Sequence, residues 1–269
     1  MIDWSEEWKK HREESSWNRW LKEKAISNEQ YWDCYEFGDR YEEYNRIAGY
    51  PGTILGRMLL HLDPSSTVLD IGAGPGAYTI PLAKVASKVT AVEPSGGQIA
   101  RLMRRADQEG LKNIDVINKR WQDIDRSELE TYTIVNAAYC FQMTDIKEDL
   151  QKMLDVTGKA LFLVSLADHG FYDVYQKVFG EQRSDPDYIY LYNCLYQMGY
   201  PANIEIFTRR YLLPLQMQLD ILKETYDLTF KAMEVLLDHL SSTGRLEDED
   251  GKDFVKRKHK DAMILYHKD

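Results

Sequence analysis

Residues 68–76 combine a short apolar run, a carboxylate and three glycines, which together suit the binding of a nucleotide-like ligand. The run reads as a buried strand that ends in a glycine-rich turn, where a ligand can lie against bare backbone. Asp70 stands just before the first glycine, Gly72. Because a carboxylate is costly to bury unless a group pairs with it, we expect a ligand with a cationic or amine group rather than a bare pyrophosphate.

The pattern of apolar and helical segments predicts how these residues are positioned. Strands are expected at 67–71, 88–92, 114–118, 132–137, 159–165, 203–209 and 263–266, and helices at 76–86, 96–109, 145–155, 186–198 and 215–241. Strands that alternate with helices favour a doubly wound α/β fold with a mostly parallel sheet. Residues 1–60 read as a helical extension that is interrupted at Ser15-Ser16, and 241–251 as an exposed loop.

Charge and composition limit the size of the core and the kinds of partner that the chain can bind. The 269 residues are 43% hydrophobic, enough for one large core, and their net charge is −10, from 34 Lys and Arg against 44 Asp and Glu. This acidic balance counts against a nucleic-acid partner, which requires a basic surface. The segment Lys256–Lys260 is the one basic cluster, and we interpret it as the solvated face of a helix.

The cysteine, histidine and apolar patterns bear on cellular location, metal binding and membrane association. Three widely spaced cysteines without a CxxC pair predict reduced thiols and a cytoplasmic location. The six histidines lack ligand spacing, so no metal site is expected. The acidic first residues lack the apolar segment of a signal peptide, and no run approaches transmembrane length, so no membrane association is expected. No pattern indicates a particular oligomeric state.

Residues 68–142 resemble the class I S-adenosylmethionine-dependent methyltransferases, whose first strand and turn carry an acid, one residue and then Gly-x-Gly. Here that stretch is Asp70-Ile71-Gly72-Ala73-Gly74. The resemblance implies that Asp70 lies near the amino acid end of S-adenosylmethionine. It also implies that the backbone of Gly72, Ala73 and Gly74 packs against this cofactor.

A looser likeness covers 60–269 and implies a domain organisation. We expect a seven-stranded, Rossmann-like methyltransferase domain at 61–269, with a helical insertion around 210–250. Residues 1–60 would then form a helical N-terminal lid. Its tryptophans either pack onto the main domain or close over a substrate, and Tyr44 or Tyr41 caps the site.

Two further stretches match positions at which the family binds its cofactor. Glu93, which ends the second strand and precedes Pro94, would accept hydrogen bonds from both ribose hydroxyls. After the third strand, Trp121 would stack on adenine and Gln122 would hydrogen-bond its amino group, with Asp123 as the alternative partner. A Trp121 that only packs against the protein is an equal alternative.

The acceptor site is less clearly marked. The end of the fourth strand should face the transferring methyl group, which assigns Ala137 to the cofactor site and Tyr139 to the acceptor pocket. The stretch 136–139 echoes the Asn-Pro-Pro-Tyr turn of amino methyltransferases, or matches it by chance. His169 after the fifth strand would serve as a base, or is a loop residue without function. Glu181 and Arg183 would bind a charged acceptor, or pair with each other.

These inferences converge on a methyl transfer by in-line displacement from S-adenosylmethionine to a small-molecule acceptor, with S-adenosylhomocysteine as the product. The alternatives are methylation of a protein or an RNA, of which the acidic balance disfavours RNA, and a non-catalytic S-adenosylmethionine-binding protein. The glycine turn with Glu93 would also suit a nicotinamide dinucleotide. Asp70 and the single glycine fingerprint count against that ligand.

Overall fold

The computed structural model of this chain describes residues 2–180, 185–226 and 228–268. Within these residues the strands form one mixed sheet in the order β3-β2-β1-β4-β5-β8-β6, and β7 pairs with β8 outside that path. Their bounds are Thr67–Ile71 (β1), Lys88–Val92 (β2), Ile114–Ile117 (β3), Tyr132–Ala138 (β4), Thr157–Asp168 (β5), Asn203–Pro214 (β6), Leu246–Glu249 (β7) and Lys252–His267 (β8). Strands β1 to β5 are parallel, and β8 is antiparallel to β5 and β6. The expected mostly parallel, Rossmann-like sheet is confirmed.

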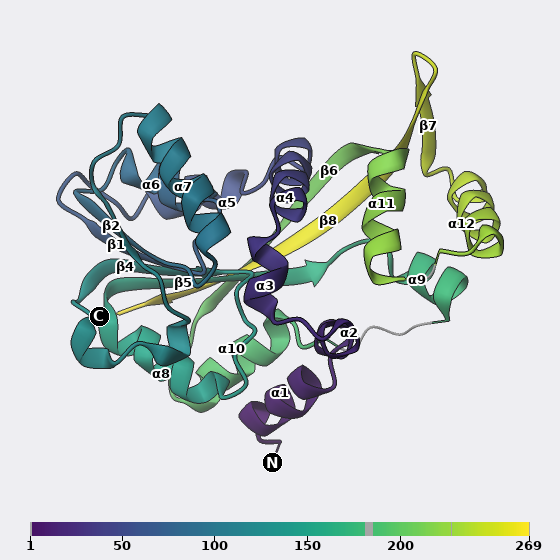
Figure 1. Ribbon diagram of the computed structural model, residues 1–269. Helices are drawn as coiled ribbons and strands as arrows, with labels where there is room; N and C mark the ends of the chain where they lie inside the picture. The colour runs from purple at the N-terminus through teal and green to yellow at the C-terminus, as the bar shows by residue number, and fades with distance from the viewer. Residues whose placement is uncertain (1, 181–184, 227, 269) are drawn as a thin grey trace.

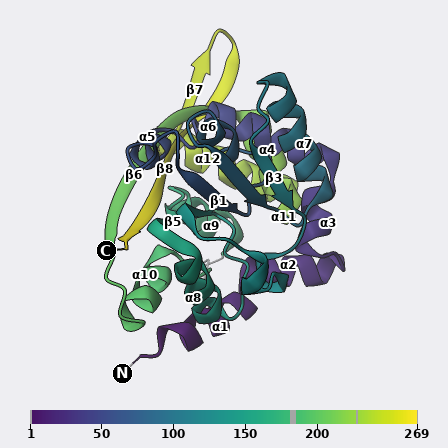
Figure 2. The ribbon, with the colours of Figure 1, turned by 90° about the vertical axis from the view of Figure 1, so that its left-hand side faces the viewer.

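Helices cover both faces of this sheet, with α5, α6 and α7 on one face and α8 and α10 on the other (Figures 1 and 2). The N-terminal helices are Trp4–Glu13 (α1), Ser16–Lys24 (α2), Asn28–Asp33 (α3), Tyr35–Ile47 (α4) and Thr53–Leu59 (α5). The others are Thr79–Ala83 (α6), Gly96–Gln108 (α7), Ile146–Val156 (α8), Tyr172–Phe179 (α9), Tyr188–Gln197 (α10), Leu215–Thr225 (α11) and Phe230–Ser242 (α12). None of the helices in the described ranges is long and apolar enough to cross a bilayer.

The central strands are mostly apolar because helices cover both of their faces, and the buried polar residues Asp70 and Asn136 lie near their carboxyl ends. In β1, Val68 packs into the cluster that includes α5 and α6, whereas Leu69 packs into the cluster that includes α8 and α10. Both side chains are fully buried. This alternation lets one strand anchor two layers, so the carboxyl ends of β1, β2 and β4 are held rigidly side by side.

The N-terminal helices are packed onto the sheet domain. The expected interruption between the first two helices is present, and the Ser15 side chain caps α2. Trp8 of α1 is fully buried, and its indole N–H donates to the Met143 carbonyl at 2.7 Å. The Asp33 carboxylate at the end of α3 accepts from the Ser95 hydroxyl at 2.7 Å and the Gly97 amide at 3.1 Å. Helix α3 is thereby fastened to the start of α7.

The helical region expected at 215–241 is present and consists of two helices, α11 and α12. Two other expectations for the C-terminal half were wrong. The expected loop at 241–251 contains β7, which forms a hairpin with β8. The basic segment Lys256–Lys260 lies within β8 rather than on a helix, and its side chains alternate between exposed and buried because successive strand residues face opposite sides.

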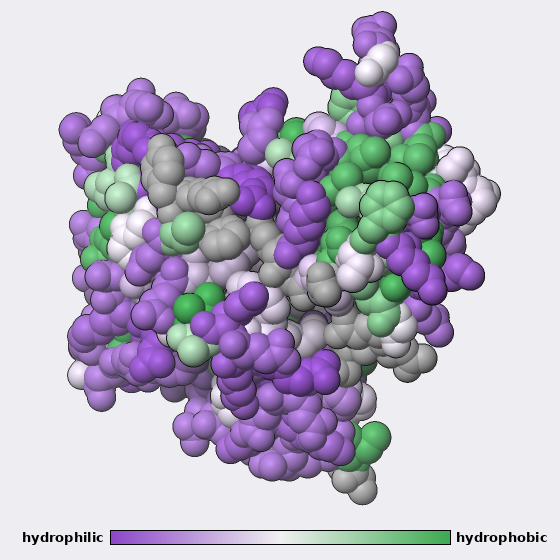
Figure 3. Space-filling view, turned by 45° about the vertical axis from the view of Figure 1, so that its right-hand side comes forward, coloured by the Kyte–Doolittle hydropathy of each residue, from purple (hydrophilic) through white to green (hydrophobic). Residues whose placement is uncertain are grey.

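The long strand β8 connects the sheet to a further hydrophobic cluster, and we call the part of the structure around that cluster the lobe. Helices α9, α11 and α12 pack there around Val174, Leu222, Leu236 and Val255. Figure 3 shows hydrophobic residues gathered on the surface of this lobe, and the Phe230 side chain is 81% exposed. The lobe therefore has its own small core, which is joined to the main one through β6 and β8.

The buried Trp8 allows a test of how firmly α1 is fixed. Changing Trp8→Ala should lower the free energy of unfolding by about 3–5 kcal/mol, because a large side chain is lost from a packed core. Trp8→Phe should cost less, since the ring is largely retained and mainly the hydrogen bond to Met143 is removed. Urea unfolding followed by circular dichroism measures both. The exposed Lys10→Ala serves as control, and equal stability of all three variants would contradict the packing described.

Candidate functional site

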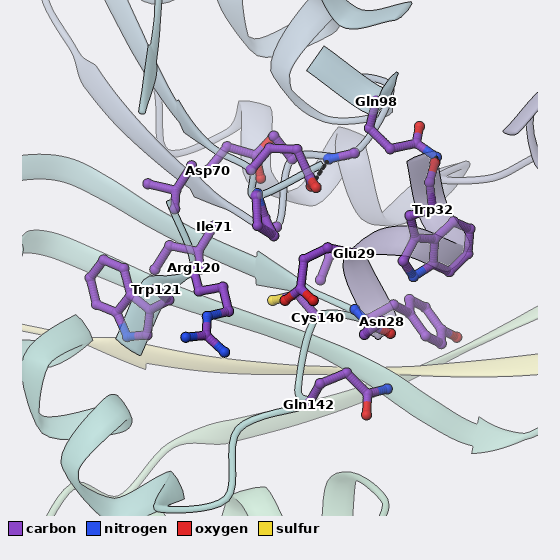
Figure 4. Close-up of a pocket in the computed structure, with 18 of the residues that line it drawn as sticks. Asn28, Glu29, Trp32, Asp70, Ile71, Gln98, Arg120, Trp121, Cys140 and Gln142 are labelled. Carbon is purple, nitrogen blue, oxygen red and sulfur yellow. Dashed lines mark hydrogen bonds between the residues drawn. The ribbon is translucent and has the colours of Figure 1, made fainter. Parts of the chain in front are cut away.

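A cavity of about 530 Å³ lies at the carboxyl ends of β1, β2 and β4. The opposite wall comes from the N-terminal helices α2, α3 and α4, which contribute Trp17, Glu29, Trp32 and Tyr41. Figure 4 shows Asp70 and Ile71 on the sheet side of this cavity and Asn28, Glu29 and Trp32 on the helical side. The N-terminal extension is therefore a wall of the site, as well as a layer packed onto the domain.

Glu93 is fixed by backbone amides at the end of β2. One carboxylate oxygen accepts from the Gly74 amide at 2.9 Å, and the other accepts from the Ser95 amide at 2.9 Å. Burial raises the pKa of this carboxyl group, and the two hydrogen bonds oppose that shift. Because each oxygen retains a further lone pair, the group can still accept two hydrogen bonds from a ligand.

Asp70 is buried beside Glu93 and is held by neutral donors. Its carboxylate accepts from the Thr79 hydroxyl at 2.5 Å and the Asn136 amide at 2.8 Å. Burial raises the pKa of Asp70 to about 6. Among the described residues neither Asp70 nor Glu93 forms an ion pair. Two buried acids without a counter-ion suit a cationic ligand, because binding would supply the missing charge.

The turn after β1 admits no side chain at Gly72. This residue has φ +68°, and a Cβ atom there would lie 2.2 Å from the Cβ of Cys140. Glycine is therefore required on both conformational and steric grounds. The turn residues Gly72, Ala73 and Gly74 line the cavity, so a ligand meets the turn directly.

Tyr139 lines the cavity in a left-handed backbone conformation, with φ +55°. Its hydroxyl donates to the Asp261 carboxylate and lies 3.0 Å from Nε2 of His259. Arg209 forms a two-point ion pair with Asp261, at 2.6 and 2.8 Å. Burial and the neighbouring Asp261 raise the pKa of Tyr139 well above its usual value. Tyr139 is therefore a fixed wall of the cavity rather than a base. Its partners His259 and Asp261, and the Arg209 that pairs with Asp261, were missed from the sequence.

Other residues expected at the cofactor site divide into two groups. Pro94, Trp121 and Gln122 line the cavity, whereas Ala137 is fully buried behind it and only its neighbour Ala138 reaches the wall. The Trp121 ring is 2% exposed, and its indole N–H donates to the Asp149 carbonyl at 3.3 Å. Its position is compatible with both alternatives raised for it, packing and contact with a ligand.

The remaining candidates lie elsewhere. Tyr44 pairs with the Tyr211 hydroxyl at 2.6 Å and is not part of the cavity wall, which Tyr41 reaches instead. The His169 ring accepts from the Phe171 amide at 3.0 Å and packs at a tilt against the Tyr172 ring, and it does not line the cavity. We therefore do not retain His169 as the base. Glu181 and Arg183 lie outside the described residues.

Comparison with known proteins gives one family. Residues 68–161 match the family described as a methyltransferase domain. An uncharacterized protein of Haemophilus influenzae is 30% identical over 162 residues, which are 59% of this chain and 60% of that protein. A 23S rRNA (uracil(1939)-C(5))-methyltransferase of Xanthomonas euvesicatoria is 42% identical over 55 residues, which are 20% of this chain and 12% of that enzyme.

A solved structure supports the fold over a longer stretch. A candidate methyltransferase from Bacillus halodurans superposes with a TM-score of 0.56 and 16% identity. The alignment covers 80% of this chain and 99% of that one. The match to the Haemophilus protein spans less than two thirds of its length, so these similarities support the fold and leave the activity and the acceptor open.

The raised pKa of Asp70 predicts how ligand binding depends on pH. A cationic ligand favours the ionised carboxylate, so the affinity for S-adenosylmethionine should fall as the pH drops below about 6. For one linked proton the limit is about tenfold per pH unit. Asp70→Asn should weaken binding at neutral pH and reduce this dependence to the part that the buried Glu93 contributes, whereas the exposed Asp107→Asn should change neither. Calorimetric titrations at several pH values measure both effects, and a flat profile in the unaltered protein would contradict the prediction.

Proposed function

We propose that this chain belongs to the class I S-adenosylmethionine-dependent methyltransferases and transfers a methyl group to a small-molecule acceptor, which the matched methyltransferase domain and the fold support. The single observation that carries the proposal is a cavity that unites Asp70, Glu93 and the glycine turn beneath a helical wall. A volume of about 530 Å³ lies within the usual range of small-ligand sites, which is about 300–1,000 Å³.

The cofactor fits the residues present. S-adenosylmethionine, when bound, supplies a methyl group activated on a positively charged sulfur. Glu93 would accept hydrogen bonds from the ribose hydroxyls, since its two oxygens are oriented by the Gly74 and Ser95 amides. Asp70 would offset the cationic amino acid end, and the backbone of the glycine turn would contact it. Trp121 and Gln122 would contact the adenine.

The chain mainly contributes position and exclusion of water to such a reaction, since the donor is already activated. Tyr139 would hold the acceptor without exchanging a proton, because its hydroxyl is committed to Asp261. The helical extension at 1–60 would act as the lid, with Tyr41 at the wall in place of Tyr44. A domain at 61–269 with a helical insertion around 210–250, and a cytoplasmic location suggested by the free cysteines, complete the proposal.

Transfer to a small molecule can be tested in a cell extract that has been fractionated by size. With S-adenosylmethionine labelled in its methyl group, the protein should label the low-molecular-weight fraction. Glu93→Gln should reduce that labelling by at least about tenfold, because it weakens the hydrogen bonds to the cofactor. Asp107→Asn serves again as the matched surface control.

Three results would contradict the proposal. Label in the protein fraction would identify a protein methyltransferase, and label in RNA would identify an RNA methyltransferase. Tight binding of S-adenosylmethionine without transfer to any fraction would identify a non-catalytic binding protein.

A further inference from the structure

We propose that the part of this cavity beneath α2 and α3 binds a positively charged amine, held by the Glu29 carboxylate and the rings of Trp17 and Trp32. The proposal rests on the function proposed above and specifies the chemical class of its acceptor. It follows from the charge and the aromatic character of the helical wall, which the cofactor contacts described above do not use.

Glu29 presents a carboxylate to the cavity, and the Arg120 guanidinium, which also lines the cavity, attracts it only at longer range than a direct ion pair. Glu29 belongs to α3, lines the cavity and is half-buried. Figure 4 shows it extending from that helix into the cavity, next to Asn28. Within the described residues no Lys, Arg or His side chain forms an ion pair with it. A partly desolvated carboxylate of this kind favours a ligand that brings a positive charge and hydrogen-bond donors.

The rings around Glu29 are held rigidly by one another. Trp17 stacks on Trp20 with 5.3 Å between ring centroids and meets Tyr31 edge-on at 4.8 Å. Trp32 meets Tyr31 at 5.0 Å, and its indole reaches the cavity wall. The Trp17 indole N–H also donates to the Asn28 side chain at 3.1 Å. Aromatic faces attract cations through their quadrupole, tryptophan most strongly, and fixed rings lose little entropy when a ligand binds.

The charges of the cavity wall disfavour an anionic acceptor. Three acids line it, namely Asp70, Glu93 and Glu29, against the single cation Arg120 among the described lining residues. Arg120 is already bound to Asp123 by hydrogen bonds of 2.8 and 3.2 Å. Because Asp70 and Glu93 are assigned to the cofactor, Glu29 is the remaining acid, and Arg120, which is shared with Asp123, offsets its charge only in part. A protonated amine restores the balance, whereas a carboxylate or phosphate would worsen it.

The test compares three probes of the same shape and different charge. These are 2-phenylethylamine, the neutral 2-phenylethanol and the anionic 3-phenylpropanoate, each titrated calorimetrically into protein saturated with S-adenosylhomocysteine. The amine should bind at least about tenfold more tightly than the alcohol, because it adds a charge-assisted hydrogen bond. The acid should bind more weakly than both.

Substitutions identify the group responsible. Glu29→Gln should weaken amine binding by about tenfold or more and leave alcohol binding unchanged, since only the charge is removed. Glu23→Gln, on the exposed side of α2, is the matched control and should bind all probes like the unaltered protein. Circular dichroism and the affinity for S-adenosylhomocysteine, measured on each variant, establish that the fold is retained.

The outcomes distinguish failure of the amine site from failure of the proposed methyltransferase function. Normal uptake of S-adenosylhomocysteine without a preference for the amine, including no binding of any probe, overturns only the amine site. If the preference for the amine persists in Glu29→Gln, the proposed role of Glu29 in binding the amine is overturned. Failure to take up S-adenosylhomocysteine overturns the proposed function, and the amine site with it.

Discussion

The structure depends on two carboxylates that are buried side by side without a cation. Asp70 accepts hydrogen bonds from a hydroxyl and a side-chain amide, and Glu93 accepts them from two backbone amides. Neutral donors therefore offset the desolvation of both carboxylates. Those donors come from the turn after β1, the first residue of α6, the N-cap of α7 and the neighbouring strand β4. The packing of β1, β2 and β4 and of the connections that follow β1 and β2 therefore holds two carboxylates in a desolvated site.

The same region holds the N-terminal helices in place. Asp33 accepts hydrogen bonds from Ser95 and Gly97, only two and four residues beyond Glu93. Farther along α7, the Arg101 guanidinium lies 3.4 Å from Asp39 and so ties α4 to the same helix. Helix α3, which carries Glu29, and the segment after β2 that carries Glu93 are thus both attached to α7. Changes in the position of α7 would alter both sides of the cavity together.

The sequence was sufficient for the parallel strands of the sheet and for placing Asp70, Glu93 and the glycine turn at one cavity. Buried parallel strands are continuous apolar runs with sharp ends, so β1 and β2 were predicted with their observed bounds. In β8 both faces are polar over Lys256–Lys260, and a strand without hydrophobic alternation looks like a charged helix. The Asp250-Gly251 turn, with φ of 52° and 77°, was the available signal for the hairpin. Glu29 and Asp261 could not be predicted, because their roles depend on contacts between distant parts of the chain.

The long strand β8 also limits how the chain can change in length during evolution. His259 and Asp261 face the Tyr139 hydroxyl, whereas Lys260 between them lies on the opposite face of the strand and is half-buried. Deleting one residue inside the strand would exchange its two faces and turn a lysine toward the tyrosine. The two-residue turn at its tip has no such constraint. Gains and losses of residues should therefore gather at that turn in related proteins, while the spacing from the lobe to the cavity stays fixed.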